Sequence, residues 1–460
     1  MKLKLIIAAF VLLFLRAEAQ QYGYWEIIDS MNVRRWTFNA AIFSNHDILA
    51  AGGDEFPNYS SAEIYNLETG LWENTTSMLQ GRVFHHLVTL NNGEVIAIGG
   101  FLIKSCEIFN PDSNSWRYTD SLETLKYFGD TATLLNDGRI LIVGGYYFDQ
   151  STLQNIYFNI CEIYDSITET WSLTDSLEEG RDGHTATLLN DGKVLVTGGI
   201  GNDSYLNSCE IYDPITNQWS SAANLLHARL RHSAVLLSDG RVLVSGGVTP
   251  DSTLGTQNCE IYDPDTDSWS EAGEMTVPRT SHKTLLLMDG TVLITGGSFE
   301  PEVWEIYDTK TLSIIYYDTL PIIVFDPEVE LLTDGRVISM GGYTFEGMTV
   351  ETSSKVLMYT PKVTSVTEEH SLVSDYSLSQ NHPNPFNPST TIKYQISQNG
   401  FVTLKVYDIL GKEIATLVNE EKPSGRYEVS FNASSFASGV YLYRLNVNDY
   451  VDVKKMILLK

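Results

Sequence analysis

The sequence predicts an all-β protein, in which a seven-bladed β-propeller is followed by a small β-sandwich. The first observation is that an apolar run ending in a Gly-Gly pair recurs along the first three quarters of the 460 residues and then stops. The second is the composition. Hydrophobic residues make up 43% of the chain, aromatic residues 11% and charged residues only 19%, which favours sheet-rich globular structure over disorder or coiled coil. A repeated unit of this kind indicates a repeat architecture rather than one ordinary core.

The first residues have the pattern of an export signal that covers residues 1–19. Lys2 and Lys4 precede the apolar run Leu5–Leu15, and small residues flank the expected cleavage point. This run is shorter than the roughly 20 apolar residues that span a bilayer, and no later segment supplies them. We therefore expect no transmembrane segment in the mature chain.

The Gly-Gly repeat occurs seven times, at intervals of 45 to 54 residues. That period is typical of one four-stranded sheet per repeat, so we assign the propeller to residues 20–363. The second glycines of the seven pairs are Gly53, Gly100, Gly145, Gly199, Gly247, Gly297 and Gly342.

Four strands fit into each repeat, and the pattern is clearest between Arg229 and Met275. Apolar residues alternate on both sides of Asp239-Gly240, which predicts a hairpin closed by a type I′ turn. A third strand is expected at Glu260–Tyr262, and a fourth begins at Trp269. The glycine pair lets the backbone bend where a side chain would collide.

A Trp strand precedes the first Gly-Gly repeat, whereas the last repeat has none. This strand carries Trp25, Met31 and Arg35, in the same spacing as the Trp, Met or Leu, and Arg or Lys of later repeats. We expect it to complete the last blade, because such a closure removes a free sheet edge. Two departures from the repeat are mild: Asn45-His46-Asp47 replaces the Asp-Gly turn in repeat one, and Ile314 replaces Trp in repeat six.

The Gly-Gly, Glu-Ile-Tyr and Trp positions resemble those of kelch repeats. The segment from Arg231 to Gly247 also resembles blades of the galactose oxidase propeller. The resemblance implies a β-propeller. Galactose oxidase chemistry needs copper held by Tyr, His and a Cys-linked Tyr, and no residues here match that ligand pattern. We therefore predict no metal and no cofactor.

Four cysteines occupy one repeat position, immediately before Glu-Ile-Tyr or Glu-Ile-Phe. Equivalent positions of neighbouring blades lie too far apart for a disulfide, which needs Cα atoms within about 7 Å. We predict buried free thiols at Cys106, Cys161, Cys209 and Cys259.

Arginines and histidines also recur at fixed repeat positions, where the innermost strand of each blade begins. One interpretation is a ring of imidazole and guanidinium groups around the channel mouth, able to hold an anion, a sugar or a metal. The other is that each histidine supports the junction between blades. The candidate ligand-binding residues are Arg82, His85, Arg181, His184, Arg229, His232, Arg279 and His282.

After the repeats, residues 364–375 form a polar stretch that we interpret as a linker, and residues 376–460 form a second unit of short alternating strands. About 85 residues of this kind predict a small immunoglobulin-like β-sandwich.

The second unit resembles the type A sorting domain of the type IX secretion system. The resemblance implies that the domain is read by the secretion machinery at the outer membrane, and that the protein reaches the cell surface or the medium. The residues that carry this sorting signal are Pro383, Asn384, Pro385, Phe386, Asn387, Pro388, Asp408, Gly411, Gly439, Tyr441, Lys454 and Lys455.

The formal net charge of −28 argues against nucleic acid as a partner, because the phosphate backbone would be repelled. Hydrolase elbows, zinc-protease helices and phosphate-binding glycine loops are absent from the sequence. The sequence therefore favours an exported protein whose propeller binds a glycan or another protein, with Tyr146–Asn159 and Gly201–Asn207 as recognition loops. The alternative is a carbohydrate-active oxidase, lyase or epimerase with its site at the channel mouth.

Overall fold

The computed structural model divides the chain into two compact units, residues 1–362 and 363–460, and we describe each by itself. It describes residues 22–43, 45–54, 59–202, 204–298, 302–346, 349–362, 376–381, 383–384, 386–396, 400–409, 411–422, 425–433, 436–448 and 450–459. The expected signal at residues 1–19 and the linker at residues 364–375 lie outside these ranges. No helix in the described part is long and apolar enough to cross a membrane.

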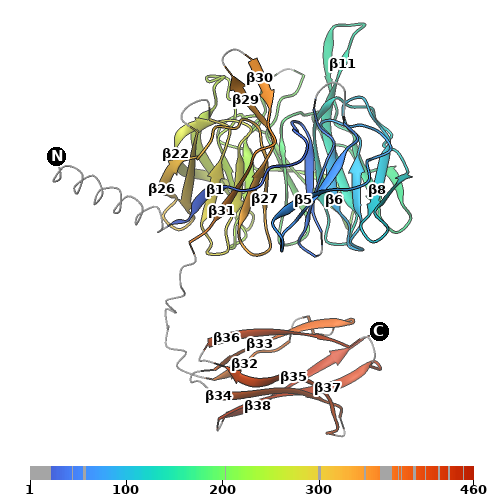
Figure 1. Ribbon diagram of the computed structural model, residues 1–460, viewed down its shortest axis with the longest axis vertical. Coiled ribbons are helices and arrows are strands. Elements are labelled where there is room, and N and C mark those ends of the chain that lie inside the picture. The colour runs from blue at the N-terminus through green and yellow to red at the C-terminus, as the bar shows by residue number, and fades with distance from the viewer. Residues whose placement is uncertain are drawn as a thin grey trace, which may run out of the picture. The chain divides into compact units, whose positions relative to one another are not determined.

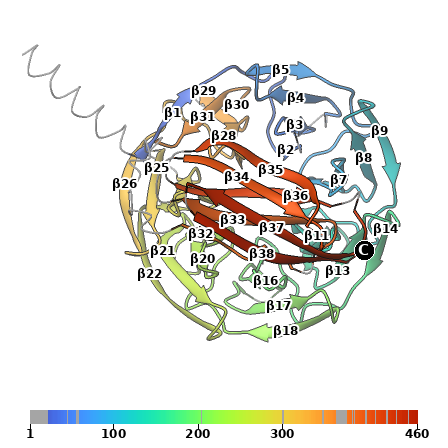
Figure 2. The ribbon, with the colours of Figure 1, turned by 90° about the horizontal axis from the view of Figure 1, so that it is seen from below.

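Seven antiparallel sheets form the first unit, and they are arranged around a ring (Figure 2). Blade 1 is built from β2 (Asn39–Ile42), β3 (Ile48–Ala51), β4 (Ala62–Asn66) and β5 (Leu71–Asn74). Blade 2 is built from β6 (His86–Thr89), β7 (Val95–Ile98), β8 (Cys106–Asn110) and β9 (Ser115–Thr119). Blade 3 is built from β10 (Phe128–Leu134), β11 (Ile140–Asp149), β13 (Cys161–Asp165) and β14 (Thr170–Leu173), and β12 (Gln154–Tyr157) pairs with β11.

The remaining blades follow the same order. Blade 4 is built from β15 (Thr185–Leu188), β16 (Val194–Thr197), β17 (Cys209–Asp213) and β18 (Gln218–Ala222). Blade 5 is built from β19 (Ser233–Leu236), β20 (Val242–Ser245), β21 (Thr256–Asp263) and β22 (Ser268–Arg279). Blade 6 is built from β23 (Lys283–Leu286), β24 (Val292–Thr295), β25 (Val303–Asp308) and β26 (Ser313–Thr319). Blade 7 is built from β27 (Glu328–Leu331), β28 (Val337–Met340), β31 (Val356–Thr360) and β1 (Tyr24–Ile27).

The N-terminal strand closes the ring, as the sequence predicts. Strand β1 pairs antiparallel with β31, so that Trp25 lies opposite Tyr359. Strand β26 fills the outer position of blade 6, where Ile314 replaces the usual Trp and pairs with Tyr307. In six blades every residue of the second strand is buried, and in blade 3 Ile140–Gly145 of β11 are buried. Neighbouring sheets cover both faces of these strands.

The hairpin turns differ from the predicted type I′ geometry. In blade 5 only Gly240 has a positive φ, of 91°, and its N–H donates to the Leu237 carbonyl at 3.0 Å. This pattern is a three-residue loop that ends in a left-handed glycine. In blade 1 His46 occupies the glycine position with a φ of 76°. The prediction of type I′ was wrong because an Asp-Gly pair suits both loops, and alternating apolar residues do not fix loop length.

Buried ion pairs hold the connection between consecutive blades. In five blades an arginine pairs with a glutamate of the third strand at 2.5 to 3.0 Å, and all five guanidinium groups are fully buried. Each arginine also donates to the carbonyl of the first glycine of the Gly-Gly pair. The pairs are Arg35–Glu63, Arg82–Glu107, Arg181–Glu210, Arg229–Glu260 and Arg279–Glu305.

Blades 3 and 7 break this pattern. In blade 3 Lys126 replaces the arginine, and its Nζ lies 3.8 Å from Asp130 and 4.0 Å from Glu162 without a hydrogen bond to a described residue. In blade 7 Leu357 takes the register position of the glutamate, opposite Ser339. The ion pair therefore belongs to most blades but is not required by the sheet itself.

In five of the seven Gly-Gly pairs, the first glycine packs against the next blade. A Cβ added to Gly246, whose φ is 61°, would lie 2.7 Å from the Arg279 carbonyl and 2.6 Å from Cε1 of His282. The equivalent contacts join Gly52 to His85, Gly144 to His184 and Gly198 to His232. The histidines therefore recur where a glycine of the preceding blade leaves room for an imidazole.

The four cysteines are buried free thiols, which confirms the prediction from their repeat position. Burial raises the pKa of Cys106 to about 11 and that of the other three to about 12. They serve as small apolar core residues.

A buried acid lies at the end of blade 6. Glu302 is 2% exposed, and its carboxyl oxygens accept no hydrogen bond from the described residues. At the equivalent place in blades 3, 4 and 5, Asn159, Asn207 and Gln257 donate their amides to backbone carbonyls. Burial raises the pKa of Glu302 to about 7, because the ionised form loses its hydration.

We expect Glu302→Gln to stabilise the protein above neutral pH. The folded pKa lies above the unfolded value of roughly 4.3, so protonation of Glu302 stabilises the fold fully below that value, and this contribution is lost as the pH rises through about 7. Urea unfolding should give E302Q an advantage of about 3 kcal/mol at pH 8.5 and little at pH 5. The exposed control Glu123→Gln should leave the free energy of unfolding unchanged at both pH values. If wild type and E302Q showed the same dependence of stability on pH, the raised pKa of Glu302 would be contradicted.

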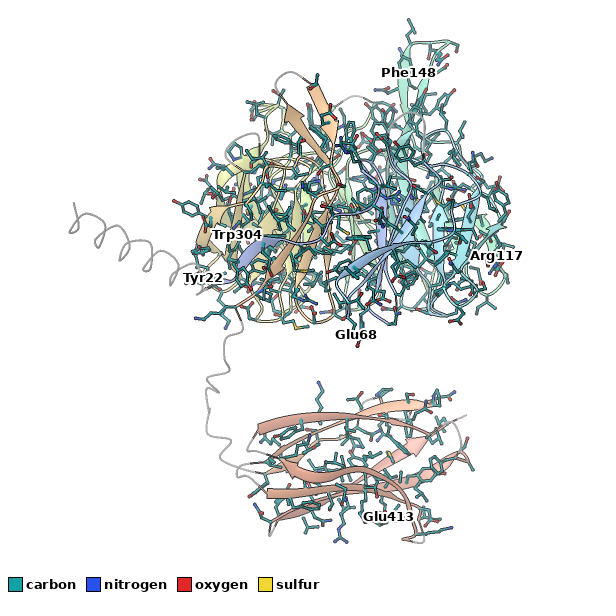
Figure 3. The ribbon with its side chains drawn as sticks, viewed as in Figure 1. Tyr22, Glu68, Arg117, Phe148, Trp304 and Glu413 are labelled. Atoms are coloured by element: carbon teal, nitrogen blue, oxygen red, sulfur yellow. The ribbon has the colours of Figure 1, made fainter. Side chains whose placement is uncertain are left out.

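Two hairpins project from one face of the propeller (Figure 1). One joins β11 to β12, and the other joins β29 (Tyr343–Glu346) to β30 (Thr349–Thr352). Phe148 lies near the end of the first hairpin (Figure 3).

The second unit is a β-sandwich of two antiparallel sheets around one core. The first sheet contains β32 (Ser377–Leu378), β33 (Ser389–Ile396) and β36 (Gly425–Asn432). The second contains β35 (Glu413–Lys422), β34 (Gly400–Tyr407), β37 (Gly439–Val447) and β38 (Tyr450–Leu458). Residues of both sheets, including Ile392, Leu404 and Tyr443, share the core. The immunoglobulin-like topology stays a prediction.

Candidate functional site at the channel mouth

A cavity of about 880 Å³ opens where the innermost strands of the propeller begin. The first strands of successive blades lie beside one another; β15, for example, contacts both β10 and β19. All seven blades contribute lining residues. The cavity is therefore the mouth of the central channel. Its volume is within the range of small-molecule sites.

A left-handed residue lies at the start of each innermost strand or just before it, and these residues form the rim of the mouth. Backbone hydrogen bonds connect several of these residues from blade to blade, such as Arg231 N–H to the Gly183 carbonyl at 2.7 Å. Because the rim is held by backbone groups, its side chains are free to vary. The seven residues, with φ between 50° and 82°, are Thr37, Phe84, Gly129, Gly183, Arg231, Ser281 and Asp326.

The structure does not bring the predicted arginines to the mouth. Arg82, Arg181, Arg229 and Arg279 are fully buried in the blade ion pairs and do not line the cavity. Because these guanidinium groups are buried there, a ligand in the mouth does not meet them.

The predicted histidines do line the cavity, but their side chains belong to the blade junctions. His85, His184, His232 and His282 are only 3% to 6% exposed. Burial, followed by the charge of the neighbouring arginine, lowers the pKa of His184 to about 3, and the other three pKa values are also lowered. Nε2 of His232 shares a hydrogen bond with the Thr197 hydroxyl at 2.9 Å. Neutral, packed imidazoles of this kind form the wall of the cavity.

Large aromatic side chains line the mouth only on the side of blades 7, 1, 2 and 3. Trp36 and Tyr343 lie 4.9 Å apart, Phe325 lies 5.4 Å from Tyr343, and Phe84 stacks on Phe128 at 4.7 Å between ring centroids. We call these five residues the aromatic crescent. Among the described residues, blades 4 to 6 contribute no Phe, Tyr or Trp to the lining.

Hydroxyl groups and cations line the side of blades 4 to 6. We call this set the polar arc. It consists of Thr185, Arg231, Ser233, Thr280, Ser281, Lys283 and Ser298.

Two polar contacts cross between blades at the mouth. His86 Nε2 lies 3.2 Å from Asp130 Oδ1, and Lys283 Nζ lies 3.5 Å from Glu328. Burial disfavours ionisation of Asp130, but His86 and Lys126 outweigh it and lower the pKa of Asp130 to about 2. Burial and the charge of Glu328 raise the pKa of Glu330 to about 8.

The base of the predicted recognition loop Tyr146–Asn159 packs against the propeller, whereas its tip is exposed. Tyr146 contacts Phe128 at 5.0 Å, and Tyr147 stacks on Tyr127 at 5.3 Å. The sequence analysis missed the aromatic crescent and the polar contacts of the mouth. In the sequence, these residues could have been noticed at the positions next to the recurring histidine, because the residue type there changes from blade to blade.

The motifs of the C-terminal unit form its turns and its last strand pairing. Phe386 is buried, and its N–H donates to the Ile457 carbonyl of β38 at 2.9 Å. Asn384 accepts the Ile457 N–H at 2.8 Å. The Gly411 N–H donates to the Asp408 carbonyl at 3.0 Å, which closes the turn between β34 and β35.

The other sorting-signal residues are distributed over the same unit. Gly439 begins β37, and the Tyr441 hydroxyl donates to the Ala437 carbonyl at 2.7 Å. Lys454 and Lys455 lie on β38, and Pro385 lies outside the described residues. The predicted sorting signal is therefore spread over turns and strands of the sandwich.

Comparison with known proteins identifies both units. Residues 48–303, more than half of the chain, match the Attractin/LZTR1 β-propeller model. The chain belongs to this β-propeller family. Residues 381–459 of this family member match the secretion system C-terminal sorting domain, which confirms the predicted type IX sorting domain. The protein is therefore a secreted kelch-type propeller that is directed to the cell surface or the medium.

The curated relatives of this β-propeller include kelch-repeat proteins. An F-box/kelch-repeat protein of Arabidopsis thaliana is 35% identical over 107 residues, which is 23% of this chain and 26% of that protein. Kelch-like protein 15 of Homo sapiens is 25% identical over 205 residues, which is 40% of this chain and 33% of that protein. The chain thus spans a quarter to a third of the length of these relatives.

Among solved structures, a fungal alcohol oxidase of the AA5 family in complex with copper has a TM-score of 0.62 at 13% identity, and the match covers 95% of this chain and 99% of that chain. At this identity the likeness shows the fold alone. In the described part of this chain, no group of three or more His, Cys, Asp or Glu side chains could hold a metal ion.

Proposed function

We propose that this secreted propeller binds carbohydrate at its channel mouth. The observation that carries the proposal is the two-sided lining of the cavity, with the aromatic crescent on one side and the polar arc on the other. A pyranose ring has one face of C–H groups that packs on aromatic rings, and hydroxyl groups that need hydrogen-bond partners. The mouth offers both within one cavity of suitable size.

The position of the site in the propeller supports this function. The rim is fixed by backbone hydrogen bonds, and the blades beneath it are held by buried ion pairs. A preformed site loses little conformational entropy on binding. Secretion also places the site outside the cell, where glycans of surfaces and of the medium are accessible.

The repeat supplies variants that test the site without damaging the blade. Ser281 and Thr280 of blade 6 occupy the places of Phe84 and Trp36, so the fold already accepts these residues there. We expect the full chain to bind oligosaccharides on a printed glycan array, and Phe84→Ser and Trp36→Thr each to weaken that binding at least tenfold.

A matched control removes an exposed aromatic side chain elsewhere on the propeller. Tyr118 lies on the outer strand of blade 2 and is 55% exposed, so Tyr118→Ala should bind as wild type does. Equal losses in all three variants, or no binding of wild type to any glycan, would contradict a carbohydrate site at the mouth.

A further inference from the structure

The neighbouring blades 2 and 3 depart at the mouth from the pattern that blades 4 and 5 share. The innermost strands of blades 4 and 5 begin with His184-Thr185 and His232-Ser233. Blade 2 has His86 in place of the hydroxyl residue. In blade 3 Asp130, opposite Gly144, occupies the histidine place. Since the other blades fold with different residues there, the structure of the propeller does not require this pair.

His86 and Asp130 form a fixed polar pair that faces the cavity. Both residues line it, with side chains 25% and 10% exposed. The hydrogen bond between His86 Nε2 and Asp130 Oδ1 leaves the other nitrogen of His86 and the other oxygen of Asp130 available. Among the described residues, neither of these two atoms takes part in a hydrogen bond, and the Lys126 Nζ lies 3.8 Å from the Asp130 oxygen.

An aromatic surface lies beside this pair and comes from the same two blades. Phe84 is two residues before His86, and Phe128 is two residues before Asp130. The two rings stack with centroids 4.7 Å apart, and both line the cavity. A stacked pair of this kind presents a rigid apolar edge next to an acceptor and an imidazole.

We propose that Phe84, Phe128, His86 and Asp130 form a monosaccharide subsite that recognises a pyranose with two adjacent hydroxyl groups. The C–H face of the sugar packs on the two phenylalanines. One hydroxyl donates to the free oxygen of Asp130, and its neighbour exchanges a hydrogen bond with the free nitrogen of His86. This inference rests on the proposed carbohydrate-binding function and adds the ligand feature that the mouth selects.

A vicinal hydroxyl pair matches this geometry better than a charged ligand does. The Asp130 carboxylate already has the Lys126 ammonium group 3.8 Å away, so an additional cation is not required, and an anion has no hydrogen to donate to the carboxylate oxygen. Neutral hydroxyl groups complete the hydrogen bonds without changing the charge. A single hydroxyl would leave one partner of a partly buried pair unsatisfied, which weakens binding.

The test uses the full chain and titration calorimetry with methyl α-mannoside, methyl β-galactoside and methyl β-glucoside, each beside its 2-, 3- and 4-deoxy forms. We expect at least one of these glycosides to bind, and its affinity to fall at least tenfold when one hydroxyl of the recognised pair is absent. His86→Thr, which inserts the residue of blade 4, and Asp130→Asn should lower the affinity for the parent sugar to a similar extent. Tyr118→Ala, on the exposed outer strand of blade 2 and outside the cavity lining, should not.

The outcomes separate this inference from the broader function. If Phe84→Ser weakens binding but His86→Thr, Asp130→Asn and every deoxy sugar bind as well as their parents, the diol subsite is overturned and the carbohydrate site stands. If wild type binds none of these sugars, in a preparation whose melting temperature shows that it is folded, the carbohydrate site and the subsite are both overturned.

Discussion

Replacing Arg181 with alanine is expected to lower the free energy of unfolding by about 3 to 5 kcal/mol. Its guanidinium group is fully buried and lies 2.7 Å from Glu210, and it donates to the Gly198 and Ser208 carbonyls at 2.9 and 3.0 Å. Removing it leaves a buried carboxylate without its counter-ion and takes one donor from each of the two carbonyls. Urea unfolding followed by tryptophan fluorescence measures the loss, because all eight tryptophans lie in the propeller.

An exposed ion pair provides the control for Arg181→Ala. Arg336 lies 2.8 Å from Asp334 in the hairpin turn of blade 7, and both side chains are about a third or more exposed. Solvent screening limits such a pair to about 1 kcal/mol or less, so Arg336→Ala should unfold close to wild type. A similar small effect of both substitutions would contradict the role of the buried pair.

The second large effect is expected at the Gly-Gly pair. Gly246→Ala should destabilise the protein by about 3 kcal/mol or more, since it combines a left-handed backbone with a collision in a packed core. The new Cβ would lie 2.7 Å from the Arg279 carbonyl and 2.6 Å from His282 Cε1. The contacting backbone atom cannot move away without shifting blade 6.

Gly290 separates the cost of the left-handed backbone from the cost of the collision. It has the same left-handed backbone as Gly246 but open space around it. Its φ is 83°, and no atom lies within 4 Å of an added Cβ. Gly290→Ala should therefore cost only about 1 kcal/mol, from the backbone conformation alone. Equal melting temperatures of the two variants would show that the contact between blades contributes nothing.

Periodicity predicts the propeller well, because each repeat uses the same residues for the same contacts. The Gly-Gly spacing, the Trp register and the early strand around Trp25 together predict the ring and its closure, and β1 pairs with β31 as expected. The turn type was wrong because Asp239-Gly240 suits two loop lengths. Only the backbone hydrogen bond from Gly240 to Leu237 distinguishes them.

The candidate site could be predicted only in part, because repetition marks what the fold needs. Arg229 and His232 recur, and both are explained by the blade, as a buried ion pair and as a junction with the preceding glycine. The mouth is instead lined by residues that differ between blades, such as Phe84 and Arg231 at one rim position. A single sequence shows this variation, but it does not show which varying positions meet in space.

The secretion unit was predictable from its motifs for a different reason. Asn384 and Phe386 bond to the last strand, and Asp408 and Gly411 close a turn, so the order of the motifs follows the assembly of the sandwich. The structure of this unit therefore agrees with the sorting domain that its sequence motifs predict.

The most direct test of the central claim is a crystal structure of the full chain with an oligosaccharide selected on the glycan array. We expect a pyranose in the channel mouth, with its C–H face on Phe84 and Phe128 and hydroxyl groups at His86 and Asp130. A sugar bound only at the hairpin of β11 and β12, on the outer strands or on the C-terminal sandwich would contradict it.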